Sequence, residues 1–221
     1  MFEIKRDYFD HPIDPDFVLC KANGERLGVI KCTEKSIDTK YNDIDEINFS
    51  TSLFMDGVQN PVYSYIDELK YVLVPGIGFF SISTIDITSE GTVNEAKSVN
   101  AKSYECLLGQ KYLEEFTINK GTTGSIDGVQ LINSADKSKS LVHLALEKCP
   151  EWDIGHVDVG LATMQRSFET DRQDIYSFLT SDVSEAFECV FIFDSLNKLI
   201  NIYKEENSGE DTNIHISYNN L

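Results

Sequence analysis

His156 and Asp158 are the residues of the sequence best spaced for catalysis or metal binding. They stand two positions apart in residues 151–158, which we predict to form a strand, so both side chains project from one face. Such a pair could be two metal ligands, or a general base and the carboxylate that orients it. No third ligand accompanies them in the sequence, which favours a histidine with a structural role.

Cys149 is the second candidate, because it could pair with His156 as in a thiol protease. No nucleophile signature surrounds it, and Pro150 directly after it is typical of the end of a helix. A metal- or thiol-dependent hydrolase using His156, Asp158 or Cys149 is therefore the alternative function. We assign no catalytic, cofactor-binding or metal-binding residue, and no cofactor.

Two loops invite a ligand-binding interpretation. Residues 121–128 are rich in glycine, but no Lys-Ser or Lys-Thr pair follows as in a phosphate-binding loop. In residues 205–211 carboxylates bracket Gly209, as they could around a calcium ion. The regular alternation of a calcium loop is missing, so we predict an exposed hairpin tip and leave calcium binding open.

The elements around these residues mix helices and strands. Ser138 or Ser140 should begin a helix that ends at Pro150. Thr170 and Gln173 have the spacing of a capping box. We expect the following helix to bury Ile175, Phe178, Leu179 and Val183. Residues 187–194, apolar on both faces, predict a central strand, and residues 199–203 predict the strand that returns beside it.

The first part of the chain predicts short strands. Asn23-Gly24 indicates a hairpin with a type I′ turn. Residues 33–44 are polar and predict a loop. Asp56-Gly57 predicts a second turn. Ile47 and Phe49 alternate with polar residues as in a strand. In residues 71–87 the apolar parity slips between Ile82 and Ile85, which predicts a bulge near residues 83–84. These strands favour a small barrel or sandwich that ends near residues 90–91. A short helix capped by Ser103 and stopped by Gly109 should follow.

Composition limits the classes of partner. The 221 residues are 41% hydrophobic, enough for a core, and 19 basic against 37 acidic residues give a net charge of −18. This charge argues against binding to nucleic acid or to an anionic membrane. The apolar segments are too short and too interrupted to span a membrane. Five widely spaced cysteines predict buried thiols rather than a disulfide framework, and the acidic first residues are unlike a signal peptide.

Several segments together resemble one known family. They are residues 60–69, the strand ending at residues 76–82, residues 97–105, residues 146–157 around Pro150 and Trp152, and the hairpin at residues 191–203. This series is similar to the N-terminal hub region of the prophage tail endopeptidase, or tail-associated lysin, family. Members of that family sit at the tail tip of long-tailed phages and resemble the baseplate hub of contractile tails.

The resemblance implies a structural protein and not an enzyme, because the wall-cleaving activity of the family lies outside the hub. It implies a homotrimer in the full-length protein that contacts the distal tail protein ring and the tape-measure protein. It further implies assembly in the bacterial host cytoplasm and no sequence-specific binding of nucleic acid. The family hub has a second barrel after a hairpin like that at residues 189–203, so we expect this chain to be a fragment.

The expected fold class is α+β. We expect a β-barrel-like domain over residues 1–92, followed by a mixed domain over residues 93–221 with helices packed on antiparallel sheet.

Overall fold

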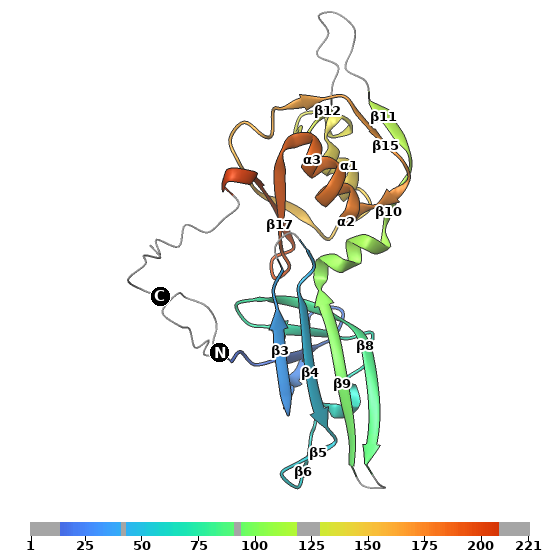
Figure 1. Cartoon of the computed structure of the whole chain (residues 1–221), viewed down its shortest axis with the longest axis vertical. Helices are drawn as coiled ribbons and strands as arrows, with labels where there is room; N and C mark the ends of the chain where they lie inside the picture. The colour runs from blue at the N-terminus through green and yellow to red at the C-terminus, as the bar shows by residue number, and fades with distance from the viewer. Residues whose placement is uncertain (1–13, 41–42, 91–93, 119–128, 208–221) are drawn as a thin grey trace, which may run out of the picture. The chain divides into compact units, whose positions relative to one another are not determined.

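The computed structural model of the chain describes residues 14–40, 43–90, 94–118 and 129–207. The chain divides into two compact units (Figure 1). The first contains residues 1–112, 174–176 and 193–199, and the second contains residues 113–173, 177–192 and 200–221.

An antiparallel sheet of seven strands forms most of the first unit, in the order β2-β1-β7-β8-β9-β4-β3. The sheet curls into a half-barrel, and with the short helices elsewhere it gives the α+β class that the sequence predicts. Its strands are β1 (Val18–Cys20), β2 (Arg26–Val29), β3 (Glu34–Asp38), β4 (Glu46–Ser52), β7 (Tyr71–Val74), β8 (Gly78–Glu90) and β9 (Asn94–Ser103).

The core of this unit lies on one face of the sheet, because every second residue of its strands points there. Ile47 and Phe49 of β4 are buried, as are Val99 and Ala101 of β9. The ring of Phe17 packs edge-on against Phe49, with centroids 5.7 Å apart. Alternation in the sequence predicts this face correctly for β4.

The bulge predicted near residues 83–84 is confirmed. The pairing of β8 with β9 shifts register between Ile82 and Thr84, and this shift returns Ile85 to the core side. The Ser83 hydroxyl donates to the side-chain oxygen of Asn100 at 2.6 Å. A hydrogen bond to the neighbouring strand thus holds the extra residue.

The two turns predicted from sequence differ in type. Both Asp56 (φ 53°) and Gly57 (φ 74°) have positive φ, as in a type I′ turn, and they connect β5 (Phe54–Met55) to β6 (Val58–Gln59). At Asn23-Gly24 the hairpin of β1 and β2 forms as predicted, but only Gly24 has a positive φ (82°). The type I′ prediction there was wrong, because one extra residue lengthens the loop, as the Gly24 N–H donating to the Lys21 carbonyl shows.

Two strands were missed in polar sequence. Strand β3 falls in residues 33–44, predicted to be a loop, and β9 is rich in Ser, Asn and Lys. β3 pairs over five residues with β4, and β4 pairs over seven with β9. The expected boundary at residue 92 lies between β8 and β9, whereas the first unit continues to residue 112, because these two strands pair along most of their length.

Short helices complete the first unit. They are η1 (Tyr63–Tyr65) and η2 (Tyr104–Gln110). The buried ammonium of Lys97 in β9 donates to the carbonyls of Tyr63, at 3.1 Å, and Ile66, at 2.9 Å. It thus provides hydrogen-bond donors for carbonyls in η1 and just after it. Ser103 does not cap η2 as predicted, because its hydroxyl donates to Glu105 at 2.6 Å instead. Nor does Gly109 stop the helix, which ends at Gln110.

The rest of the chain forms short strands and helices. Strands pair as β10 with β16, β11 with β15, β12 with β14, and as the three-stranded sheet β13-β18-β17. The elements are β10 (Tyr112–Leu113), β11 (Phe116–Ile118), β12 (Val129–Gln130), η3 (Lys137–Lys139), α1 (Leu141–Leu146), β13 (Asp153–Val157), β14 (Gln165–Arg166), β15 (Phe168–Thr170), β16 (Gln173–Asp174), α2 (Ile175–Ser177), η4 (Phe178–Val183), α3 (Ser184–Phe187), β17 (Cys189–Asp194), β18 (Leu199–Lys204) and η5 (Glu205–Asn207).

Both predicted helices exist. The side chain of Ser140 accepts the His143 N–H at the start of α1, as an N-cap does. From α2 through α3 the chain is continuously helical, with η4 wound as a π-helix. The four residues predicted to be buried, Ile175, Phe178, Leu179 and Val183, are all fully buried.

Two predictions in this region were wrong. Thr170 ends β15, so it is not a helix cap; its hydroxyl donates to Asp182, and the Gln173 amide donates to both Thr170 and Asp182. These side chains thus bond to one another and to the helix instead of closing a capping box. Strand β17 lies at the edge of its sheet and β18 at the centre, although Phe191 of β17 is only 3% exposed.

Candidate functional surfaces

The predicted proximity of His156 and Asp158 is confirmed, at the end of β13. Nε2 of His156 lies 3.0 Å from Oδ1 of Asp158. The His156 ring stacks on Tyr203 with centroids 5.0 Å apart, and its backbone N–H donates to Asn201 at 2.8 Å. The imidazole is 54% exposed. The imidazole is therefore open to solvent, whereas the Asp158 carboxylate beside it is mostly buried.

Asp158 joins β13 to the end of β18. Its Oδ2 accepts the Asn207 side-chain amide and the Lys204 backbone N–H, each at 2.9 Å. These two bonds, followed by the one from His156, lower the pKa of Asp158 from 3.8 to about 2. The carboxylate therefore stays ionised and keeps its three hydrogen bonds, so its role is to hold the ends of β13 and β18 together.

The hydrolase candidates do not assemble into a site. Cys149 is fully buried after α1, where its sulfur cannot reach a substrate. Within the described residues, no three His, Cys, Asp or Glu side chains gather closely enough to hold a metal ion. Residues 205–207 form η5, while 208–211 and the glycine-rich loop 121–128 lie outside the described part.

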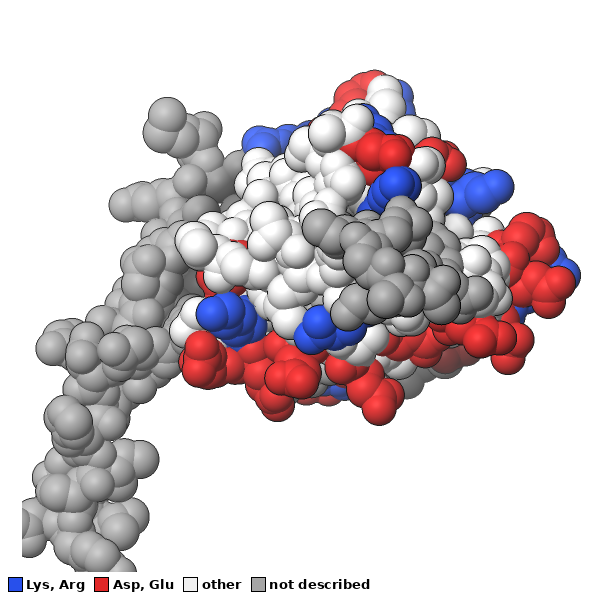
Figure 2. All heavy atoms as spheres, turned by 90° about the horizontal axis from the view of Figure 1, so that it is seen from above, with Lys and Arg blue, Asp and Glu red and all other residues white. Residues whose placement is uncertain are grey.

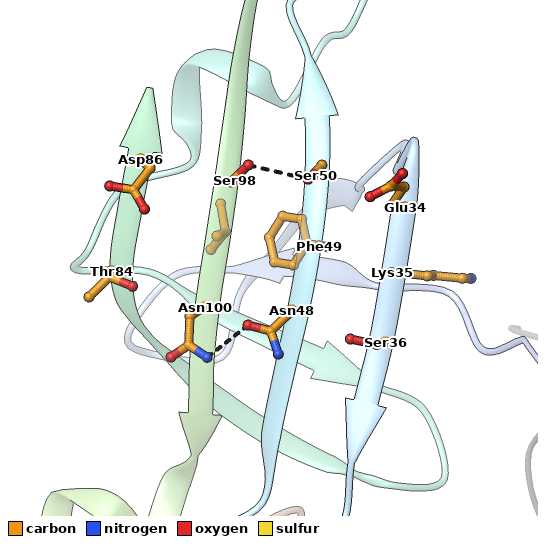
Figure 3. Close-up of a pocket in the computed structure, with 11 residues that line it drawn as sticks. Glu34, Lys35, Ser36, Asn48, Phe49, Ser50, Thr84, Asp86, Ser98 and Asn100 are labelled. Carbon is orange, nitrogen blue, oxygen red and sulfur yellow. Dashed lines mark hydrogen bonds between the residues drawn. The ribbon is translucent and has the colours of Figure 1, made fainter. Parts of the chain in front are cut away.

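The exposed face of the seven-stranded sheet is a surface that sequence reasoning missed. Its side chains form two rows across β3, β4, β9 and β8 (Figure 3). The pairing registers align Glu34, Ser50, Ser98 and Asp86 in one row, and Ser36, Asn48, Asn100 and Thr84 in the other. The rows line a shallow hollow of about 330 Å³.

Hydrogen bonds tie these rows together. Asn100 donates to Asn48 at 2.9 Å, and the hydroxyls of Ser50 and Ser98 lie 3.3 Å apart. The strand alternation at residues 47–52 already pointed Asn48 and Ser50 away from the core. The complete surface could not be predicted, because β3 and β9 had not been recognised as strands. The rows present hydroxyl, amide and carboxylate groups on an open face of the sheet.

Comparison with known proteins gives likeness of fold alone. No family model matches the sequence, and no curated protein matches it. Among solved structures, a tail protein from Neisseria meningitidis MC58 superposes with a TM-score of 0.56 at 8% identity, over 85% of this chain and 49% of that protein. The 43 kDa tail protein of prophage MuSo2 from Shewanella oneidensis gives 0.52 at 12% identity, over 85% of this chain and 52% of that protein.

The chain has the fold of these tail proteins. It spans about half the length of each of them. Both of these structures are tail proteins, the kind of protein that the sequence resemblance names. None of the helices in the described part of the chain is long and apolar enough to cross a membrane.

Proposed function

We propose that this chain is a structural component of a phage or prophage tail. More specifically, it acts as a tail hub that connects the tail tube and the distal tail ring to the machinery at the tail tip. The observation that carries the proposal is the fold shared over 85% of the chain with two tail proteins. The family resemblance in the sequence supports the finer assignment to the hub.

The candidate surfaces fit an assembly role better than a catalytic one. His156 and Asp158 join neighbouring strands, and Cys149 is buried. The two polar rows across β3, β4, β9 and β8 offer hydroxyl and amide groups to a wet protein interface or to a solvent-filled passage. We therefore propose no reaction for this chain, and we do not favour the hydrolase.

The partners follow from the hub assignment. The full-length protein would form a homotrimer, bind the distal tail protein ring and meet the tape-measure protein. It would be assembled in the cytoplasm of the bacterial host and remain in the virion at the tail tip.

Immunogold electron microscopy of induced phage particles tests the position. Antibodies raised against the chain should label one end of the tail. Labelling along the whole tube, or its absence from particles, would contradict a hub. Light scattering of the protein with and without the distal tail ring protein tests the contact, and no change in mass on mixing would count against it.

A peptidoglycan-release assay tests the rival function. The purified chain should release no soluble wall fragments. Release that a chelator or a thiol reagent abolishes would establish the hydrolase instead.

A further inference from the structure

The loop between β1 and β2 carries the single Asn-Gly pair of the sequence, Asn23-Gly24. Both residues are exposed. Gly24 has φ 82°, and a Cβ built on it would meet no atom within 4 Å. The peptide unit between the two residues is therefore open to water, and no side chain stands beside its nitrogen.

An asparagine followed by glycine can react with its own main chain. The backbone nitrogen of the glycine attacks Cγ of the asparagine, and the side-chain amide nitrogen leaves as ammonia, which closes a succinimide ring. Water opens this ring by adding to either of its carbonyl carbons. Opening at Cγ gives aspartate, whereas opening at the main-chain carbonyl leaves the chain joined through Cγ as isoaspartate. Glycine favours the attack, because it has no Cβ to crowd the nitrogen.

Hydrogen bonds of the loop act on both partners of this reaction. Oδ1 of Asn23 accepts the Glu25 N–H at 3.0 Å. The attack places negative charge on this oxygen, and a donor already in position stabilises such charge. The Gly24 N–H donates to the Lys21 carbonyl at 2.9 Å, and this bond must break before the nitrogen loses its proton. It lies in an exposed loop, where local opening costs little free energy.

The other asparagines lack this combination. Every one of them is followed by a residue with a Cβ. Asn60 is 3% exposed, and Pro61 after it has no N–H to react. Asn48 and Asn100 lie in the paired strands β4 and β9, and their side-chain amides are bonded to each other. Exposure, a following glycine and a donor to the amide oxygen together distinguish Asn23.

We propose that Asn23 is a site of spontaneous deamidation in the folded protein, where attack by the Gly24 nitrogen releases ammonia and water then yields aspartate and isoaspartate. The reaction adds a negative charge to a chain of net charge −18, whose acidic side chains gather along one border of the face in Figure 2. Isoaspartate also lengthens the main chain just before β2, a strand at the edge of the seven-stranded sheet. The proposal does not depend on the tail assignment.

Peptide mapping by mass spectrometry tests the proposal on the full folded chain, kept at mildly alkaline pH because the backbone nitrogen must lose its proton. The peptide that contains Asn23 should gain, with time, the mass difference between an amide and a carboxylic acid, and chromatography should separate an aspartate and an isoaspartate form. The peptide that contains Asn197, which is exposed but followed by Lys198, should stay unchanged. The intact protein should elute later from an anion exchanger as it ages.

Asn23→Gln is the matched control, since glutamine keeps the amide but would have to close a larger ring, which forms more slowly. It should abolish both products, and thermal melting checks that the variant folds. Two outcomes would overturn the proposal. One is the absence of a mass gain at Asn23 in the folded chain while the urea-unfolded chain reacts, which would show that the loop protects it. The other is an equal gain at Asn197, which would show that Gly24 confers no selectivity.

Discussion

At the scale of single residues, Asp158 shows how a predicted catalytic group can serve a structural role. Its carboxylate binds the Asn207 amide, the Lys204 N–H and His156 at once. Because its pKa falls from 3.8 to about 2 on folding, its contribution to stability is complete above pH 3.8. That contribution is lost as the pH falls from 3.8 towards 2.

Asp158→Asn should therefore make the unfolding free energy depend less steeply on pH between about 4 and 2, because one linked carboxylate is gone. Urea unfolding at a series of pH values measures this dependence. Asp153→Asn, at the start of β13, is the control for the loss of one carboxylate. Identical slopes for both variants would show that Asp158 is not the linked group.

Gly78 and Ser195 form a second residue-scale pair, in the first unit. The Ser195 hydroxyl accepts the Phe79 N–H at 2.9 Å, and a Cβ on Gly78 would lie 2.9 Å from the same oxygen. Gly78→Ala should cost about 1–3 kcal/mol by overpacking, and Ser195→Ala about 1–3 kcal/mol by leaving the N–H unpaired.

The two changes should not add, because the obstructing oxygen is absent once Ser195 is alanine. A double-mutant cycle from chemical denaturation should give a smaller total than the sum of the single effects. If the two effects add exactly, the Ser195 side chain moves aside at little cost and is not what opposes a methyl group at Gly78.

At the scale of elements, β17 shows that a strand at the edge of a sheet can still carry a buried residue. It is the edge strand of β13-β18-β17, yet Phe191 is 3% exposed and its neighbour Ile192 40% exposed. Phe191→Ala should cost about 3–5 kcal/mol by leaving a cavity. Ile192→Ala should cost much less, since its side chain already meets water. Thermal melting of both variants compares them, and equal shifts in melting temperature would contradict this difference in burial.

At the scale of the whole molecule, charge governs the encounter with DNA. A net charge of −18 repels phosphates over about 8 Å at physiological salt. A protein that lines or flanks a passage for DNA benefits from walls that do not hold it. We expect no retention of duplex DNA in a mobility-shift assay, even at low salt, where any attraction would be strongest. DNA binding that weakens as salt is added would show that the protein attracts phosphates, and would contradict this role for the negative charge.

The features that the sequence predicts correctly are those set by neighbouring residues. The parity slip at Ile82 marks the bulge, Asp56-Gly57 turns a hairpin, and Ser140 begins a helix. Each depends on one strand period, one backbone preference or one capping hydroxyl, all of which act within a few residues. The acidic net charge and the proximity of His156 to Asp158 can likewise be predicted without knowing the fold.

Only the tertiary structure decides what depends on distant partners. Strands β3 and β9 are polar, and they are strands because each pairs with β4, so the two rows of polar side chains exist only in the assembled sheet. The same holds for Thr170, whose hydroxyl donates to Asp182 instead of capping a helix N-terminus. Local sequence sets turns, caps and periodicity, whereas burial and hydrogen bonding between remote segments determine which surfaces form.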